Sequence, residues 1–298
     1  MSERTIILLY FKSFEEVIPK GLTDEFSINN DYWNKCGILT FEDLSFIIRH
    51  FTRYFFSTYF IFKSIIRLSK YSFMIKHYAS KAIVTHSEYS FCSSLFTSYA
   101  NSRNVEHINV MHREKLYFIR DSLFHFNRCY VWHQHYIDLM KSLKAEEYQF
   151  IVALPASMRI DLDRYNNKSY YADYKYYLAI YDETQIRSIV QSMNRFKERG
   201  FTIKYRPHPR YSDISLLRKY LHEDEIEYAD KVSILSSVAS LEYAVGLYTT
   251  VLSQAYFSGK SVALDNITYI REYKQLKDLR YFLCRAYEIR KLSSFYES

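Results

Sequence analysis

Residues 201–266 constrain the fold most, because strand-like and helix-like segments alternate through them at short spacing. Apolar runs such as FTIKY, EYAVGLY and SVALD are each followed or preceded within a few residues by a segment with helical patterning. Such alternation builds parallel sheets, since each crossover helix returns the chain to start the next strand in the same direction. A similar alternation fills residues 81–150 and 175–200. We therefore expect an α/β protein of two Rossmann-like lobes, residues 1–150 and 151–298, with a cleft between them.

Two polar motifs follow predicted strands within this stretch. The first is Pro207-His208-Pro209, flanked by Arg206 and Arg210. Proline fixes its own φ and moves the preceding residue out of the helical region, so His208 is expected in extended backbone. Its imidazole could donate a proton or a hydrogen bond to a phosphate oxygen.

The second motif is a set of three hydroxyl-bearing residues at the start of a predicted helix, Thr249, Thr250 and Ser253. Hydroxyls and unpaired N–H groups at a helix N-terminus bind anions. With His208, Arg206 and Pro209 they predict a phosphate site at the carboxyl ends of parallel strands. The simpler alternative is a rigid turn and an ordinary helix cap.

Composition excludes several classes of protein. Of 298 residues, 48% are hydrophobic and only 5 are Gly and 4 Pro, so a disordered or loop-rich chain is not expected. The four cysteines are widely spaced, which predicts reduced thiols of a cytoplasm rather than disulfides or a metal site. We find no signal peptide, no apolar run long enough to span a membrane, and neither GxGxxG nor a Walker motif.

The net charge of +7 suits an anionic substrate or anionic lipid. We take the excess to be spread along the chain, and no nucleic-acid-binding motif is present, so nucleic acid is not an expected partner. Residues 41–78 combine aromatic and aliphatic side chains with recurring Lys and Arg, which predicts one or two helices with a basic stripe. Two interpretations stay open: a core helix with a basic edge, or a surface for the inner membrane or an anionic acceptor.

The paired motifs resemble those of bacterial sialyltransferases and polysialyltransferases of the GT-B fold. His208-Pro209 matches the family's HP motif, and Thr249-Thr250 stand where that family usually has serines; the resemblance covers mainly residues 175–266. It implies a metal-independent, inverting transfer of sialic acid or a related ulosonic acid from a CMP-sugar donor, with no further cofactor. The histidine would support CMP departure and the hydroxyl pair would bind its phosphate. The acceptor would be a glycan or glycolipid of the bacterial surface, in capsule or lipopolysaccharide.

Such enzymes need a carboxylate in the N-terminal, acceptor-binding lobe to deprotonate the acceptor hydroxyl. Glu114 is the candidate base, with His112 and Arg113 beside it on the acceptor side, and Asp121 and Glu88 are alternatives. Arg113 is a poor residue for a catalytic turn that prefers Gly. His133 and His135 have the spacing of a metal pair but no third ligand nearby, so no metal is expected.

Two other functions stay open: a GT-B transferase that uses a UDP- or GDP-sugar, and a non-catalytic glycan-assembly protein with a degenerate site. The expected location is the cytoplasm, with peripheral association at the inner face of the cell membrane.

Overall fold

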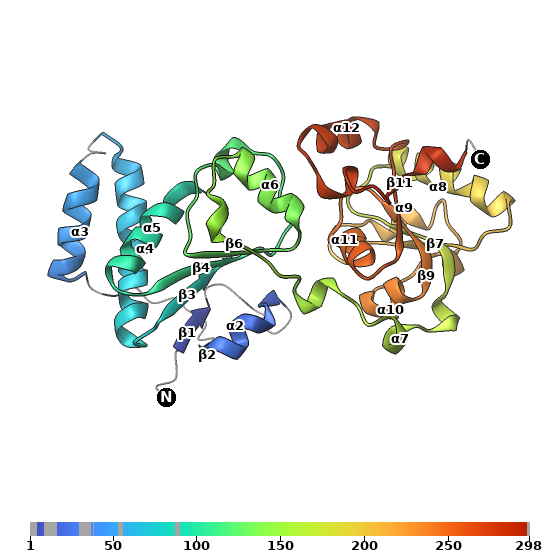
Figure 1. The fold of residues 1–298 in the computed structure, drawn as a ribbon. Helices are drawn as coiled ribbons and strands as arrows, with labels where there is room; N and C mark the ends of the chain where they lie inside the picture. Colours follow the sequence, from blue (N-terminus) through green and yellow to red (C-terminus); the bar gives the residue numbers. More distant parts are fainter. Residues whose placement is uncertain are drawn as a thin grey trace. The chain divides into compact units, whose positions relative to one another are not determined.

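The computed structural model describes residues 5–8, 17–29, 37, 39–52, 56–86 and 90–296. The chain divides into two compact units. The first unit comprises Met1–Arg113 and Tyr117–Ala156, and the second comprises Glu114–Leu116 and Ser157–Ser298. Each unit is built around one parallel sheet (Figure 1).

The sheet of the first unit has six strands in the order β2-β1-β3-β4-β5-β6, and every neighbouring pair is parallel. Its strands are β1 (Thr5–Leu8), β2 (Ser27–Asn29), β3 (Ala82–Thr85), β4 (Glu106–Val110), β5 (Arg128–Val131) and β6 (Phe150–Val152). Its α-helices are α2 (Lys20–Glu25), α3 (Phe41–Phe51), α4 (Thr58–His77), α5 (Ser90–Ser102) and α6 (Gln134–Ser142). The predicted strands at 81–85, 105–111 and 128–132 are therefore confirmed.

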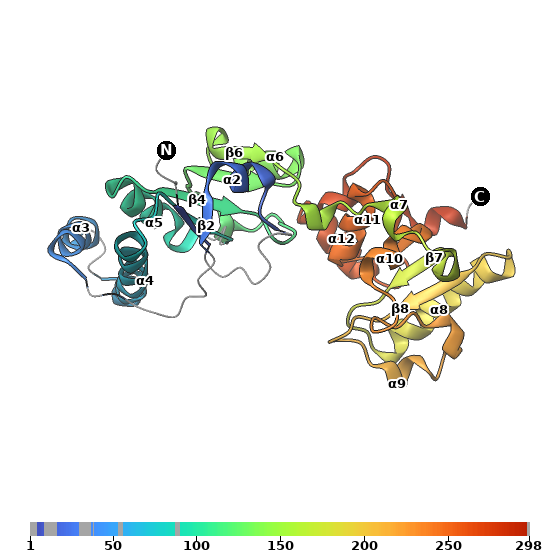
Figure 2. The ribbon, with the colours of Figure 1, turned by 90° about the horizontal axis from the view of Figure 1, so that it is seen from below.

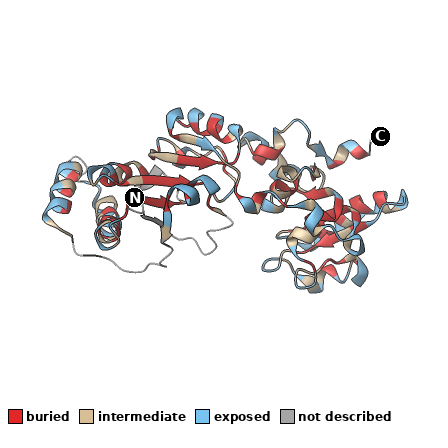
Figure 3. Cartoon of the chain, turned by 60° about the horizontal axis from the view of Figure 1, so that its bottom comes forward, coloured by how far each residue is buried: buried red, intermediate tan, exposed pale blue. Residues whose placement is uncertain are grey.

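Alternate residues of β3 supply two separate cores, one on each face of this sheet. Ala82 and Val84 pack in a cluster with Leu22 of α2, whereas Ile83 packs with residues of α3, α4 and α5. Successive side chains of a strand point to opposite faces, so a strand covered on both sides is apolar throughout. Figure 3 shows the resulting burial of the central strands.

One buried carboxylate connects α3 to α4 and α5. Asp43 accepts hydrogen bonds from Ser72 of α4 at 2.8 Å and from Tyr99 of α5 at 2.6 Å, and Arg103 lies 2.7 Å from it. Burial raises the pKa of Asp43, but the hydrogen bonds from Tyr99, Thr40 and Ser72 outweigh it and hold that pKa well below its usual range. The stretch 41–78 thus forms two helices, which lie side by side in Figures 1 and 2.

The sheet of the second unit has five parallel strands in the order β11-β10-β9-β7-β8. They are β7 (Ala172–Tyr177), β8 (Ile203–Arg206), β9 (Leu241–Gly246), β10 (Ser261–Leu264) and β11 (Arg290–Lys291). The α-helices are α7 (Leu162–Tyr165), α8 (Glu183–Glu198), α9 (Ile214–Leu217), α10 (Ile234–Ala239), α11 (Thr250–Phe257) and α12 (Ile270–Asp278). Asp182 caps α8 in a capping box, and Gly200 follows its end at φ +87°, as the sequence predicts.

The strand predicted at 226–230 is the main difference in this unit. Only one bridge, between Tyr205 and Ile226, forms there. Glu223–Glu225 form a 3-10 helix instead, and the side chain of Glu227 turns inward to two cations described below. Among the described residues, no helix is both long and apolar enough to cross a bilayer.

Candidate nucleotide-binding site

The second sheet changes its direction of growth at β7. The chain runs from β7 to β8 on one side and then returns to β9 on the other side of β7. In open α/β sheets, ligands bind at the carboxyl ends of strands beside such a switch. Arg206 pairs with Tyr177, and Val245 with Tyr176, so the three strands end nearly level. The segments that follow β8 and β9 are therefore about 10 Å apart, two strand spacings, across the end of β7.

His208 follows β8 in a turn fixed by several contacts. Its backbone N–H donates to Ser212 Oγ at 2.8 Å, and that hydroxyl donates to the carbonyl of Ala179, just after β7, at 2.9 Å. The imidazole stacks on Tyr211 with ring centroids 4.5 Å apart. The turn that the two prolines predict is thus also tied to the neighbouring strand.

The contacts of His208 select one tautomer. Its Nδ1 lies 3.1 Å from the backbone N–H of Arg210 and accepts that hydrogen, so the ring proton of the neutral form is on Nε2. Partial burial, and then the charge of Arg210, lowers the pKa of His208. At neutral pH the ring is therefore an uncharged hydrogen-bond donor through Nε2. This favours a hydrogen bond to a phosphate over the donation of a proton.

Arg206 does not lie at the sheet edge as the phosphate ligand that the sequence predicts beside His208. It is buried, and its guanidinium donates to Glu227 and to the carbonyl of Val232, both at 2.8 Å. Glu227 also binds the fully buried Lys175 at 2.6 Å. Burial lowers the pKa of Lys175, and the carboxylate of Glu227 opposes that shift. Arg206 thus points into the interior of the unit, where its charge is paired with Glu227.

Thr249 begins the helix that faces this turn across β7. It is the N-cap of α11, and its hydroxyl accepts the N–H of Val251 at 3.4 Å, a long hydrogen bond. Thr250 is the first residue of the helix and is exposed. Ser253 is buried and hydrogen-bonds Tyr281. The structure thus places Thr249 and Thr250 at the sheet edge with His208, and turns Ser253 toward the interior.

Gly246 lets β9 end close against β7. Its φ is +156°, and a Cβ at this position would lie 3.1 Å from the carbonyl oxygen of Tyr177. A side chain here would push the two strands apart just before the Thr249 turn. The local geometry of the site thus depends on a residue that sequence reasoning did not single out.

The first sheet carries its own polar residues at its carboxyl edge. His86 directly follows β3 and His112 follows β4, and their rings are 4.2 Å apart. The indole N–H of buried Trp132 donates to the carbonyl of Met111 at 3.0 Å and so holds the turn that leads into His112. Sequence reasoning found His112 but missed His86. Its signal was a histidine directly after the fully buried strand AIVT.

Glu114 belongs by its contacts to the second unit, although Arg113 belongs to the first and is exposed. Burial raises the pKa of Cys284 to about 11, and the negative charge of Glu114 adds to that rise. Burial and Glu114 likewise raise the pKa of Tyr281. Glu114 thus lies near both groups, and its role as a base stays a prediction.

The remaining candidates are placed as follows. Asp121 is buried, with Arg120 3.7 Å away, and Glu88 lies outside the described residues. His133 caps α6 and accepts the N–H of His135 at 3.1 Å, so this imidazole already has a local role. Across the described ranges, no three His, Cys, Asp or Glu side chains gather as a metal site would require.

Comparison with known proteins gives no match by sequence: no protein-family model and no curated protein matches the chain. Solved structures do match. A UDP-N-acetylglucosamine 2-epimerase of Listeria monocytogenes, described as putative, aligns over 88% of this chain and 79% of its own, with a TM-score of 0.54 and 9% identity. The S. aureus protein MnaA, in a co-structure with UDP, aligns over 88% and 78%, with a TM-score of 0.51 and 11% identity. The UDP-GlcNAc 2-epimerase of Methanocaldococcus jannaschii aligns over 91% and 86%, at 0.50 and 12%.

The chain has a GT-B type fold. At 9–12% identity these matches establish the fold alone. The expected α/β architecture with two Rossmann-like units is confirmed. In this GT-B chain, His208 and Thr249 lie at the carboxyl edge of the C-terminal sheet.

Proposed function

We propose that this chain is a nucleotide-sugar enzyme that binds a UDP-sugar at the carboxyl edge of its second sheet and transfers the sugar to a glycan hydroxyl. The observation that carries the proposal is the placement of neutral His208 and the Thr249-capped helix on either side of the end of β7. The strands that lead into these two groups lie about 10 Å apart, two strand spacings, on either side of β7. The carboxyl edge beside a topological switch point is also where open α/β sheets hold ligands.

The reaction would be a displacement at the anomeric carbon. The acceptor oxygen forms a bond to that carbon while the bond from the carbon to the phosphate oxygen breaks, and its electron pair stays on the phosphate. The Nε2–H of His208 and the N–H groups that begin α11 stabilise the charge that develops there. The acceptor proton passes to a carboxylate, for which Glu114 stays our candidate.

The choice of UDP over CMP rests on the structural neighbours. One of them was solved with UDP, and others are named as enzymes of UDP-GlcNAc. The HP motif and hydroxyl pair instead resemble those of CMP-sialic acid transferases, so a CMP-activated acidic sugar is the alternative donor. A bacterial surface glycan, in capsule or lipopolysaccharide, is the acceptor class we propose for either donor.

Epimerisation is the second candidate reaction. Two of the structural neighbours, with TM-scores of 0.54 and 0.50, are named as 2-epimerases of UDP-N-acetylglucosamine. Both reactions use the same nucleotide site. They differ in their products: an epimerase converts the nucleotide sugar without any acceptor. NMR analysis of a UDP-GlcNAc incubation would therefore separate them, since a product inverted at carbon 2 in the absence of acceptor would replace transfer as the activity.

Calorimetric titration with UDP, CMP and GDP tests the nucleotide site. We expect UDP to bind the wild type most tightly, and Thr249→Val to weaken it several-fold while Thr249→Ser, which keeps the hydroxyl, does not. Tight binding of CMP alone would favour the sialyltransferase-like alternative. No binding of any of the three would refute the proposal and favour a non-catalytic assembly protein.

A further inference from the structure

The positive charge of this chain is concentrated in one segment. Residues 44–87 contain no Asp or Glu, and they contain seven Lys or Arg residues: Arg49, Arg53, Lys63, Arg67, Lys70, Lys76 and Lys81. The chain has 40 Lys and Arg in all, so 33 remain to balance its 33 Asp and Glu. The excess of +7 therefore lies in this segment. This corrects the expectation that the excess charge is spread along the chain.

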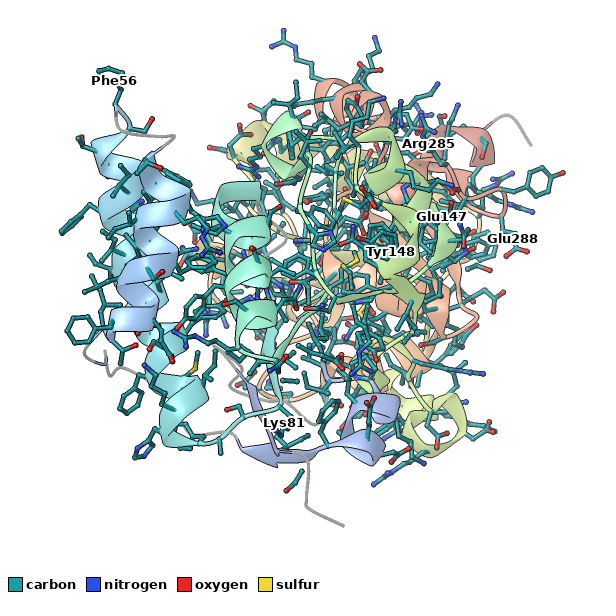
Figure 4. All side chains as sticks on the ribbon, turned by 60° about the vertical axis from the view of Figure 1, so that its left-hand side comes forward. Phe56, Lys81, Glu147, Tyr148, Arg285 and Glu288 are labelled. Carbon is teal, nitrogen blue, oxygen red and sulfur yellow. The ribbon has the colours of Figure 1, made fainter. Side chains whose placement is uncertain are left out.

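Within the segment, α4 exposes a stripe of apolar side chains. Phe56, at the turn before the helix, is 96% exposed, Tyr59 is 68% and Phe62 is 64% exposed, and Ile66 continues the row. The spacing of Tyr59, Phe62 and Ile66, three to four residues, places these three side chains on one face of the helix. Figure 4 shows Phe56 projecting from the tip of the α3–α4 pair. Aromatic side chains of this size are normally covered, so a continuous row of them indicates a binding surface.

Cations border this stripe. Lys63, Arg67 and Lys70 follow the apolar residues at the same helical spacing, and Lys63 Nζ lies 4.6 Å from the centre of the Tyr59 ring. Within the helix, from Tyr59 to Lys70, the stripe runs about 16 Å along the axis. A helix with an aromatic face next to a basic border has the composition of one that lies in a membrane interface.

The opposite face of α4 is packed firmly against the unit. Leu68, Tyr71 and Met74 are buried in the core with Ile83 of β3, and Ser72 reaches the buried carboxylate of Asp43. The exposed aromatic residues are therefore the outer face of a well-anchored helix. A second stripe of exposed apolar residues lies on α3, at Phe41, Leu44 and Ile48.

We propose that the α4 surface, defined by Phe56, Tyr59, Phe62, Ile66, Lys63, Arg67 and Lys70, binds the face of an anionic phospholipid bilayer. Charge decides between a bilayer and a second copy of the chain. In a symmetric dimer the patch meets its own copy, so two surfaces that carry cations and no carboxylate would be brought together. Anionic headgroups complement the cations, while the rings enter the interface between headgroups and acyl chains. The binding needs no nucleotide and is independent of the function proposed above.

Co-sedimentation of the full chain with vesicles tests the proposal. We expect binding to vesicles that contain phosphatidylglycerol, weaker binding at high salt, and little binding to phosphatidylcholine alone. A cation near an anionic leaflet raises the partition coefficient roughly fivefold. The double variant Lys63→Glu/Arg67→Glu should therefore lower it by more than roughly twenty-fivefold. Phe56→Ser/Phe62→Ser should lower it even at low salt.

Lys81→Glu is the matched control, because it reverses an exposed cation of the same unit outside α4. Because Lys81 lies outside the proposed surface, the partition coefficient of this variant should stay within about twofold of the wild-type value. Thermal unfolding of each variant checks that the fold is retained. Equal binding by Lys63→Glu/Arg67→Glu and Lys81→Glu would overturn the proposal. So would a wild type that ignores anionic vesicles, or a dimer in light scattering that Phe62→Ser dissociates.

Discussion

Replacement of His208 by alanine removes the Nε2–H group that we assign to the departing phosphate. A hydrogen bond to a charged group contributes about 1.5–3 kcal/mol. At about 1.4 kcal/mol for each factor of ten, its loss should lower kcat/KM for the donor sugar by about 10- to 150-fold. If the bond strengthens as charge develops on the phosphate, most of this loss will appear in kcat.

The fold should tolerate this change. The imidazole is only partly buried, and the one backbone group that would lose its acceptor, the N–H of Arg210, belongs to an exposed residue that water can reach. We expect the loss of stacking on Tyr211 to cost about 1 kcal/mol or less.

Donor turnover by wild type, His208→Ala and His208→Gln is the assay. Glutamine keeps a donor group near the position of Nε2, so it should retain more activity than alanine. Thermal unfolding of the three proteins controls for stability. If His208→Ala turns over the donor as fast as an active wild type, then His208 does not contact the leaving group and the mechanism proposed here is wrong.

Three further predictions concern stability. Glu227→Ala leaves two buried cations without their counter-charge and should cost about 3–5 kcal/mol in urea unfolding, whereas Glu223→Ala at an exposed pair should leave the unfolding midpoint unchanged. Burial, and then the charge of His125, lowers the pKa of His107 to about 3. The unfolded state therefore binds more protons than the folded state below about pH 6.5, and the free energy of unfolding should be about 2 kcal/mol lower at pH 5 than at pH 7. The variant His107→Asn should remove this difference, measured by urea unfolding at the two pH values. Gly246→Ala forces a side chain into a positive φ beside a carbonyl oxygen and should cost about 1–3 kcal/mol, measured by thermal unfolding; an unchanged melting temperature would contradict this.

The order of elements could be predicted from local pattern, because each buried strand and each capped helix carries its own signal. Asp182 and Gly200 mark the ends of α8, and Thr249 marks the start of α11, through chemistry within a few residues. The positions of His208 just after β8 and of Thr249 just after β9 follow from that order. Local signals therefore suffice for the fold class and for the core of the candidate site.

Contacts between distant residues could not be predicted in this way. Arg206 looked like a phosphate ligand because it adjoins His208, but its partner Glu227 is brought beside it only by the tertiary fold. His86 and His112 are 26 positions apart in the sequence and meet because β3 and β4 are neighbours in the sheet. The short strands at the sheet edges, such as β11, which pairs with β10, have too few residues to show the alternation of apolar and polar side chains that marks a strand.

The indole of Trp132, which holds the His112 turn, gives this protein an optical property of practical use. Trp132 lies in the first unit, while the proposed nucleotide site lies in the second. The sequence has one other tryptophan, Trp33, which lies outside the described residues. In a Trp33→Phe variant, tryptophan emission therefore comes from the first unit alone and does not report local events in the second. A shift in that emission when UDP is added would be a direct signal that binding in one unit is transmitted to its neighbour.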